Sequence, residues 1–194
     1  RAPSRMISLA PQFTELIFAI GLQDPLCAVT AFCNYPDEVK TKSIVGGLTA
    51  QSVNLESLLG LEPDLIVCSA DTHEIILSKS DELGVEVLVL GSQDLAGMYR
   101  DMEILGKIFQ VEQAAESLKL NCQRRIEHVE QFVHQLDRSE KPRIFYQVWD
   151  DPLMGAGPNS FIGEILDLAG ALNILHDVEN PYPYVSEETI IERN

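Results

Sequence analysis

The sequence is poor in basic side chains: among its 194 residues, 14 Lys and Arg stand against 30 Asp and Glu, which gives a formal net charge of -16. A chain this acidic is repelled at long range by nucleic acids and by anionic lipid surfaces. We therefore expect partners that are neutral, cationic or lined with basic side chains. The sequence also lacks an 18-residue apolar run, so it predicts no membrane span.

Cysteine is scarce and irregularly spaced. No two cysteines form a Cys-x-x-Cys pair, the spacing typical of zinc and redox sites; the four are Cys27, Cys33, Cys68 and Cys122. We interpret them as buried free thiols, with at least Cys68 and Cys122 as packing residues. In an oxidising compartment Cys27 and Cys33 could form a bridge, so cysteine usage leaves the compartment open.

The motifs of common enzymes are missing as well. The sequence contains no Gly-x-Ser-x-Gly turn, and its predicted loops do not group a Ser, a His and an acidic residue. It therefore gives no indication of a hydrolase. The glycine-rich segment 155–160 fits neither phosphate-binding template, because Ser160 stands where a dinucleotide site needs a third glycine, and the Gly-Lys of a P-loop is absent. We predict a plain turn there, with Ser160 as a helix N-cap. No catalytic residue is predicted.

The sequence also gives little evidence for a metal site. His73 follows a predicted strand, with Asp71 and Glu74 nearby, but a zinc site needs further partners at ligand spacing. A surface histidine is the better interpretation, and we predict no metal site.

What the sequence does contain is a regular alternation of buried-strand patterns and amphipathic-helix patterns. Glycines close several of the helices. The predicted strands are 6–9, 26–30, 64–68 and 86–90, and the predicted helices are 11–20, 54–61, 72–83 and 94–109. Such alternation predicts an α/β fold with a parallel sheet covered on both faces.

The segment 111–137 is the longest feature of the chain. It has an apolar stripe at helical spacing and contains no Gly or Pro, and a helix of that length would run about 40 Å. Charged side chains such as Arg124 and Glu127 exclude a membrane span. Because strand and helix patterns lie on both sides of it, we favour a rigid connector between two lobes over an ordinary surface helix of one domain.

Beyond the connector the pattern of the first lobe starts again. We predict a strand at 143–148, a loop from Trp149 to Pro158 and a helix at 160–169 ended by Gly170. Two stretches also repeat in order: 15–21 resembles 164–170, and 53–59 resembles 185–191.

These patterns predict two parallel-sheet α/β lobes, an N-terminal lobe at 1–110 and a C-terminal lobe at 139–194, bridged by the helix at 111–138. We expect the C-terminal lobe to be incomplete (truncated), since roughly 55 residues are near the lower limit for an independent core.

Ligands of parallel α/β sheets bind beyond the carboxyl ends of the strands. The loops there are rich in aromatic side chains, namely Phe13, Phe32, Tyr35 and Trp149, with Tyr182 and Tyr184 in a Pro-rich turn. We expect Phe13 to be a core residue. For Trp149, the only tryptophan, a ligand wall and an ordinary position are equally supported. Two lobes on one helix would face each other across a ligand cleft.

A series of short motifs runs through the chain in this order: Ile7-Ser8-Leu9-Ala10-Pro11 with Thr14-Glu15, Asn34-Tyr35-Pro36, Val45-Gly46-Gly47, Asn54-Leu55-Glu56, Leu61-Glu62-Pro63-Asp64-Leu65-Ile66, Gly157-x-x-Ser160 and Pro183-x-Val185-Ser186. Together these motifs resemble the substrate-binding proteins of ABC importers for cobalamin, haem and iron–siderophores. The resemblance covers essentially the whole chain. Residues 149–154 and Pro181-Tyr182-Pro183 are most similar to the cobalamin (vitamin B12)-binding branch.

The resemblance implies a receptor and not an enzyme: two α/β lobes on a helical backbone capture cobalamin, a corrinoid, in the cleft and deliver it to a membrane permease. It implies a periplasmic or other extracytoplasmic location, free or lipid-anchored, and we expect a monomer with no cofactor besides the ligand. Carried over by position, the ligand-binding residues are Tyr35, Gly47, Leu48, Ser69, Ala70, Asp71, Trp149 and Tyr182.

The family also docks its permease through one surface Glu in each lobe, and the resemblance places these at Glu56 and Glu188. A carboxylate stabilised by the start of a helix would explain either one alone. Their symmetric placement and the acidic net charge favour docking on a basic partner face.

Other ligands stay open. A haem or iron–siderophore receptor of the same fold would bind iron through Tyr or His or hold the chelate with Arg, and a metal-ion receptor would need His73 and further ligands. Outside the family, the alternative is a two-lobed α/β enzyme.

Overall fold

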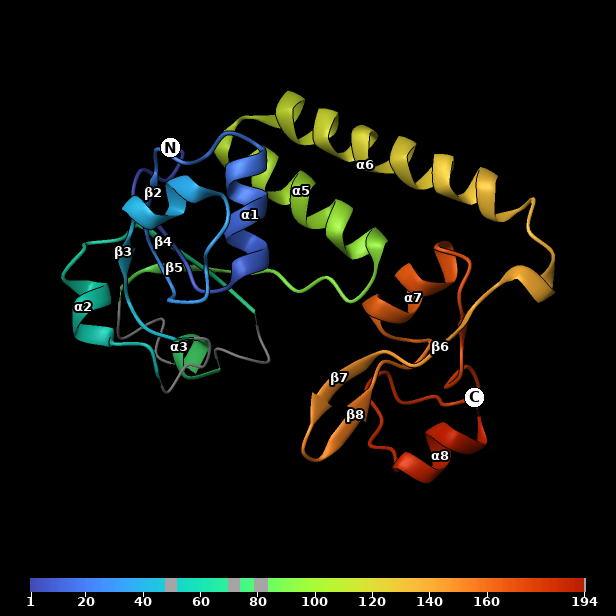
Figure 1. The fold of residues 1–194 in the computed structure, drawn as a ribbon. Helices are drawn as coiled ribbons and strands as arrows, with labels where there is room; N and C mark the ends of the chain where they lie inside the picture. Colours follow the sequence, from blue (N-terminus) through green and yellow to red (C-terminus); the bar gives the residue numbers. More distant parts are fainter. Residues whose placement is uncertain (48–51, 70–73, 79–83, 194) are drawn as a thin grey trace. The chain divides into compact units, whose positions relative to one another are not determined.

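The computed structural model describes residues 1–47, 52–69, 74–78 and 84–193 (Figure 1). The chain divides into two compact units. The first is Arg1–Gly91 with Tyr99–Lys119, and the second is Ser92–Met98 with Leu120–Asn194. Helices α5 and α6 therefore contribute residues to both units.

The first unit is built on a five-stranded parallel sheet with the strand order β3-β2-β1-β4-β5. The strands are β1 (Met6–Ser8), β2 (Leu26–Val29), β3 (Ser43–Ile44), β4 (Leu65–Cys68) and β5 (Glu86–Val89). The central strands β1 and β4 are buried along their whole length. Strands buried on both faces carry continuous apolar runs, which is why the sequence predicted these two correctly.

Helices cover both faces of this sheet. They are α1 (Pro11–Ala19), α2 (Leu55–Leu59), α3 (Glu74–Ser78) and α5 (Leu95–Phe109), with a short 3-10 helix η1 (Asp37–Thr41) after β2. Met6 packs in one apolar cluster with Leu105 of α5, whereas Ile7 packs in a second cluster with Leu58 of α2. Figure 1 shows α1 and α5 on one side of the sheet and α2 and α3 on the other. The predicted α/β fold class is confirmed.

All four cysteines are free thiols. Cys33 belongs to the apolar cluster of Met6 and Cys27 packs against that of Ile7, on opposite faces of the sheet, so the bridge considered between them is absent. Cys68 is fully buried at the end of β4, and Cys122 is half-buried on α6. The interpretation as packing thiols is confirmed for Cys33 and Cys68.

The long helix predicted in mid-chain is α6 (Glu112–Val133), which has 22 residues and a length of about 33 Å. Its only fully buried side chains are Ala115 and Val133, one near each end. Near its start, α6 approaches α5 closely, since a Cβ built on Gly106 would lie 2.8 Å from Cβ of Ala115. The helix ends four residues earlier than predicted, and the chain continues into the 3-10 helix η3 (Arg138–Glu140).

The second unit contains two small sheets. Strands β6 (Arg143–Ile144) and β9 (Leu172–Asn173) are parallel, and β7 (Gln147–Asp150) and β8 (Leu153–Gly155) form an antiparallel hairpin. Its helices are α7 (Phe161–Leu168) and α8 (Glu187–Glu192).

The hairpin corrects two sequence predictions. The expected strand at 143–148 is broken into β6 and β7, and the expected loop from Trp149 is part of strand β7 and the turn into β8. Only two residues, Asp151 and Pro152, separate β7 from β8. Gly155 leaves room for Phe145, because a Cβ at that glycine would lie 2.6 Å from the Phe145 ring. Local patterns do not show this pairing.

Two helix pairs of the predicted internal repeat have similar caps, α1 and α7 at their ends and α2 and α8 at their starts. Gly21 and Gly170 end α1 and α7 with φ of 81° and 80°, the left-handed conformation that glycine adopts without strain. In both, the glycine amide donates to the carbonyl three residues earlier and the next amide to the carbonyl five residues earlier, at 2.8 to 3.0 Å. Asn54 and Ser186 cap α2 and α8 alike, each accepting from the amide three residues on.

Candidate functional site

The first unit brings three predicted ligand residues to one edge of its sheet. Tyr35 follows β2, Gly47 follows β3 and Ser69 follows β4, and the carboxyl ends of parallel strands lie at the same edge. The other three predicted residues of this unit, Leu48, Ala70 and Asp71, lie outside the described residues. The ligand role of all six stays a prediction. His73, predicted to be a surface histidine, also lies outside the described residues.

Two aromatic side chains at this edge are available to a ligand. Tyr35 is 65% exposed and Phe32 is 56% exposed, whereas Phe13 is a core residue, as expected. The Phe32 ring lies over the glycine turn, since a Cβ built on Gly47 would meet its Cε2 at 3.8 Å. Phe32 therefore joins Tyr35 and Gly47 on one patch, although the resemblance did not point to it.

The turn beside these aromatics requires glycine. Gly46 has φ of 149°, and a Cβ there would lie 2.3 Å from the carbonyl oxygen of Ser52. The Gly46 carbonyl in turn accepts a 2.8 Å hydrogen bond from Ala31, the first residue of the loop that carries Phe32 and Tyr35. The two segments therefore hold each other at the sheet edge.

In the second unit, the Pro-rich turn runs alongside strand β8, with hydrogen bonds of 3.0 Å from the Gly155 amide to Pro183 O and from the Val185 amide to Leu153 O. Met154 of β8 pairs with Trp149 on one side and forms an antiparallel bridge to Tyr184 on the other. Residues paired across antiparallel strands point to the same face, so these three side chains form a row. Tyr182 lies two residues before Tyr184 in the same Pro-rich turn.

The aromatic side chains beside Met154 are exposed, and the ligand role of Trp149 stays a prediction. Trp149 is 59% exposed, Tyr184 is 67% and Tyr182 is 40%. The Trp149 indole donates a 3.0 Å hydrogen bond to the Asp151 carbonyl, which fixes the ring against its own turn. Exposed rings held in a row present a wide apolar surface, and neighbouring exposed aromatics are unusual without a partner.

Two members of this row, Met154 and Tyr184, were not among the ligand residues carried over from the resemblance, although Tyr184 was noted as one of the aromatic side chains near the predicted cleft. The resemblance pointed only to Tyr182, and the pairing that adds Tyr184 joins residues 30 positions apart. The signal that could have found Tyr184 is its period-two spacing from Tyr182 on either side of Pro183.

The predicted N-cap in the glycine-rich segment is confirmed. Ser160 Oγ accepts a 2.9 Å hydrogen bond from the amide of Gly163 and donates a 2.7 Å bond to the carbonyl of Gly157. A Cβ at Gly163 would lie 2.1 Å from that same carbonyl, so the glycines serve close packing of backbone on backbone. This segment positions α7 and contains no phosphate cradle.

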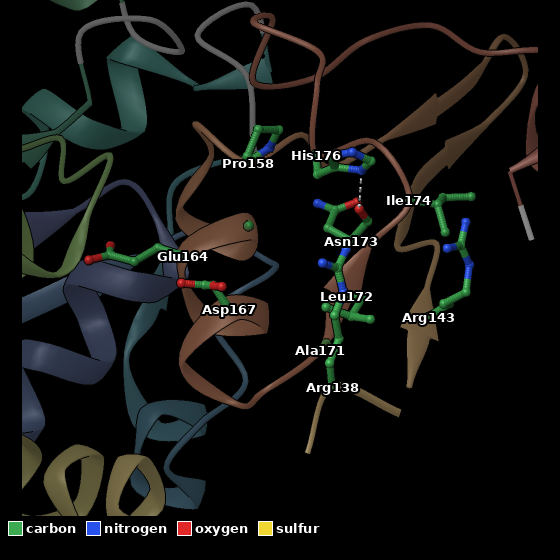
Figure 2. Close-up of a pocket in the computed structure, with 11 residues that line it drawn as sticks. Arg138, Arg143, Pro158, Glu164, Asp167, Ala171, Leu172, Asn173, Ile174 and His176 are labelled. Carbon is green, nitrogen blue, oxygen red and sulfur yellow. Dashed lines mark hydrogen bonds between the residues drawn. The ribbon is translucent and has the colours of Figure 1, made fainter. Parts of the chain in front are cut away.

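A pocket of about 520 Å³ also lies in the second unit, between α7 and the strands β6 and β9 (Figure 2). Its polar lining includes Arg138, Arg143, Glu164, Asp167 and Asn173. Figure 2 shows His176 beside Asn173, whose carbonyl oxygen lies 3.2 Å from Nδ1 of the histidine. No residue predicted to bind ligand lines this pocket, and its charges of both signs suit an apolar macrocycle poorly. We do not assign the ligand to it.

The described residues include no group of three or more His, Cys, Asp or Glu that could hold a metal ion. Burial raises the pKa of the Cys68 thiol to about 11, and burial is also the main cause that raises the pKa of Cys27. A cysteine nucleophile needs a lowered pKa, so neither thiol is activated.

The two glutamates predicted to dock a permease occupy equivalent positions. Glu56 and Glu188 each stand two residues after the N-cap of a helix, on α2 and α8, and both are exposed. Hydrogen bonds from its own backbone amide and from the Ser186 hydroxyl lower the pKa of Glu188. The start of α8 therefore stabilises the Glu188 carboxylate. The equivalent positions of Glu56 and Glu188 follow from the internal repeat. Docking itself stays a prediction.

An α/β fold with exposed aromatic side chains beyond the carboxyl ends of its strands is an arrangement suited to binding a ligand with a broad apolar face. Residues 6–194 match the family described as periplasmic binding protein. The chain belongs to the periplasmic binding protein family.

Individual relatives agree with this family. The vitamin B12-binding protein of Yersinia pestis (strain Pestoides F) is 31% identical over 198 residues, covering 100% of this chain and 68% of that protein. The crystal structure of the periplasmic vitamin B12-binding protein BtuF of Vibrio cholerae is similar, with a TM-score of 0.81 and 28% identity over 99% of this chain and 74% of that one. A possible iron-binding, periplasmic solute-binding protein from Staphylococcus epidermidis has a TM-score of 0.84 and 26% identity, covering 100% and 75%.

Within the part of the chain that the structure describes, no helix is both long and apolar enough to cross a membrane.

Proposed function

We propose that this chain is the substrate-binding protein of an ABC importer and that it binds cobalamin. The observation that carries the proposal is the row formed by the exposed rings of Trp149 and Tyr184 on either side of the half-buried Met154. The relatives supply the ligand class, because the names of two of them specify vitamin B12. A corrinoid is a large, rigid macrocycle, and broad apolar walls suit it better than many hydrogen bonds do.

The residues of the site follow from the two exposed patches. Tyr35, with Phe32, Gly47 and Ser69, forms the proposed contact surface of the first unit, to which the resemblance adds Leu48, Ala70 and Asp71. Trp149 and Tyr182, with Met154 and Tyr184, form that of the second unit. We propose that the ligand is bound without covalent change, with no further cofactor and with no catalytic role for the chain.

The proposed partner is the membrane permease of the importer. Glu56 and Glu188 are the proposed docking carboxylates, because the internal repeat puts them at equivalent, exposed helix starts. Basic pockets on the permease would receive them, in keeping with the net charge of -16. We propose that the protein acts as a monomer outside the cytoplasm, where its relatives are named as periplasmic.

The test is isothermal titration calorimetry of the protein with three ligands: cyanocobalamin, haemin and a ferric siderophore. The proposal predicts tight one-to-one binding of cyanocobalamin, at about 1 µM or below, and weaker binding of the other two. The iron-binding relative makes an iron chelate the second candidate. Preferential binding of haemin or of the siderophore would keep the receptor role and reject cobalamin. Binding of none of the three would contradict the proposal.

A further inference from the structure

The loop at 31–35 has a single inward-facing side chain. Phe32 and Tyr35 are exposed, as are Ala31 and Asn34, whereas Cys33 is buried with 8% exposure. The side chain of Cys33 is thus the part of this loop that enters the core of the first unit.

The Cys33 sulfur lies between two buried threonine hydroxyls. Oγ1 of Thr14 is 3.2 Å from Sγ, and Oγ1 of Thr30 is 3.3 Å from it. Thr14 also lies 2.8 Å from the Ser8 hydroxyl, which donates to the carbonyl of Ala10. Since Ser8 ends β1, Thr14 belongs to α1 and Thr30 follows β2, this polar cluster ties three elements to the loop.

Position 33 holds a group that can both donate and accept hydrogen bonds within this cluster. Each hydroxyl and the thiol has one proton. The Thr14 hydroxyl has three acceptors within reach, Ser8 Oγ, Ala10 O and Cys33 Sγ, while either partner of the Thr30 and Cys33 pair can donate. A thiol can accept from one threonine and donate to the other, which satisfies buried polar atoms that would otherwise lose a partner.

The backbone of the loop is held at the same place. The amide of Ala31 donates to Gly46 O at 2.8 Å, and the amide of Cys33 donates to Thr30 O at 3.0 Å. These two bonds fix the start of the loop, and the Cys33 side chain fixes its middle. Phe32 and Tyr35 stand on either side of that anchor and therefore face outward together.

We propose that Cys33, held by Thr14 and Thr30, is a positioning residue for ligand binding: it sets the loop so that Phe32 and Tyr35 present their rings at the sheet edge. This rests on the proposed function, because the orientation of the two rings matters only if a ligand contacts them. Cys33 itself touches no ligand. A rigid, preset wall saves the ordering cost that a mobile loop would impose on binding.

The test compares Cys33→Ser, which keeps a donor and acceptor, with Cys33→Ala, which removes both. A third variant, Thr30→Val, removes the hydroxyl that pairs with Cys33. Cys122→Ala on α6 is the control for loss of a cysteine. Thr41→Val is the control for Thr30→Val, since the exposed Thr41 hydroxyl bonds only to Glu38 O among the described partners. Three quantities are measured for each variant: hydrogen exchange of the Ala31 and Cys33 amides without ligand, the Kd for cyanocobalamin, and the urea midpoint of unfolding.

Cys33→Ala and Thr30→Val are expected to speed exchange at both amides and to weaken cyanocobalamin binding about fivefold, the effect of one lost hydrogen bond. Cys33→Ser is expected to restore both quantities, and the two controls to leave them unchanged. A lower urea midpoint with unchanged exchange and unchanged Kd would reduce Cys33 to a core residue and overturn the proposal.

A further variant separates this proposal from the proposed function. Tyr35→Ala should weaken binding while leaving amide exchange as in the wild type, because it removes a contact and not the anchor. If the wild type does not bind cyanocobalamin, the ligand assignment fails, whereas faster exchange in Cys33→Ala would still show that Cys33 holds the loop. Unchanged exchange in a protein that does bind would overturn the positioning role alone.

Discussion

At the scale of single residues, the aromatic side chains divide sharply by position. Phe13 lies in the core, whereas Trp149 and Tyr184 lie on an open strand face, where water meets their rings. Burying such rings against a ligand removes a large apolar area from water, which is the main source of affinity for a macrocycle. The exposed rings, and not the charged pocket of the second unit, are therefore where binding energy is expected.

Tyr184 provides the test at this scale, because the structure and not the resemblance points to it. Tyr184→Ala is expected to weaken cyanocobalamin binding about tenfold, because truncating a central aromatic contact costs roughly 1 kcal/mol or more. Tyr184→Phe is expected to retain most of the affinity. Phe132→Ala on α6 is the matched control, since that ring is similarly exposed at 63%. Equal Kd values for the two alanine variants would remove Tyr184 from the site.

Asp64 has a structural role that the sequence did not reveal. Its carboxylate accepts hydrogen bonds from the amide of Ser4 at 2.7 Å and from that of Arg5 at 2.9 Å, which fastens the chain just before β1. Partial burial acts to raise the pKa of Asp64, but these hydrogen bonds outweigh it and leave the pKa lowered. The ionised form is thus favoured in the folded state.

Asp64→Asn is expected to reduce the free energy of unfolding at neutral pH by roughly 0.5–1 kcal/mol, a modest loss because solvent reaches this site. The pKa of Asp64 is lower in the folded than in the unfolded protein. Its contribution to stability is therefore fully present above the unfolded pKa, about pH 4, and is lost as the pH falls through the folded pKa. Urea unfolding of the wild type and of Asp64→Asn at decreasing pH should show the difference between their free energies of unfolding shrinking. A difference that is constant with pH would contradict the role of the ionised carboxylate.

At the scale of elements, the sequence predicted what local patterns determine. The buried strands β1 and β4 and the helices α1, α5 and α6 were found from periodicity, and Gly21 and Gly170 correctly marked helix ends. The two-residue strands β3 and β9 and the hairpin β7–β8 were not found, because their pairing partners, and not their own residues, define them. The same limit hid the pairing of Tyr184 with Met154, whereas Tyr35, Trp149 and Tyr182 were reached through the resemblance.

The start of α5 is held by a residue distant in sequence. Glu164 of α7 accepts a 2.8 Å hydrogen bond from the amide of Leu95, the first residue of α5, and Asp94 accepts from the amide of Gly97 at 2.5 Å. Both carboxylates satisfy helix amides that have no partner within the helix. Leu95 and Glu164 both belong to the second unit, so this contact holds the first residue of α5 within that unit.

Glu164→Ala is expected to lower the free energy of unfolding by about 1–2 kcal/mol, because it leaves the half-buried Leu95 amide without its acceptor. Glu164→Gln keeps an acceptor and should lose less. The control is Glu112→Ala, which removes an exposed carboxylate from the first turn of α6 and should cost about 0.5 kcal/mol. Chemical denaturation measures all three, and equal losses for the two alanine variants would show that the Glu164 bond adds nothing.

At the scale of the whole molecule, the internal repeat and the negative charge act together. The repeat sets one exposed glutamate at the start of a helix in each unit, Glu56 and Glu188, and the chain has an excess of acidic side chains. A basic partner face would attract the molecule at long range and read the two glutamates at contact. Because the proposed ligand-binding and docking residues are different, we expect mutation to separate the two functions.

Reversing both glutamates, Glu56→Lys with Glu188→Lys, is expected to abolish ligand uptake into vesicles that contain the permease and to leave the Kd for the ligand unchanged. A double variant with the same change in net charge, Glu112→Lys with Glu127→Lys on α6, should retain most of the uptake. Normal transport by the first pair, or equal loss with both pairs, would contradict specific docking.

The most direct measurement for the central claim is a titration of the protein with cyanocobalamin followed by tryptophan fluorescence, corrected with free tryptophan for absorption by the ligand. Trp149 is the only tryptophan in the chain, and its ring is exposed. A change in its fluorescence therefore reports both that the ligand binds and that it binds beside Trp149. The account predicts saturable quenching with a midpoint near or below about 1 µM. Fluorescence that follows the free-tryptophan control throughout would contradict a corrinoid site walled by Trp149.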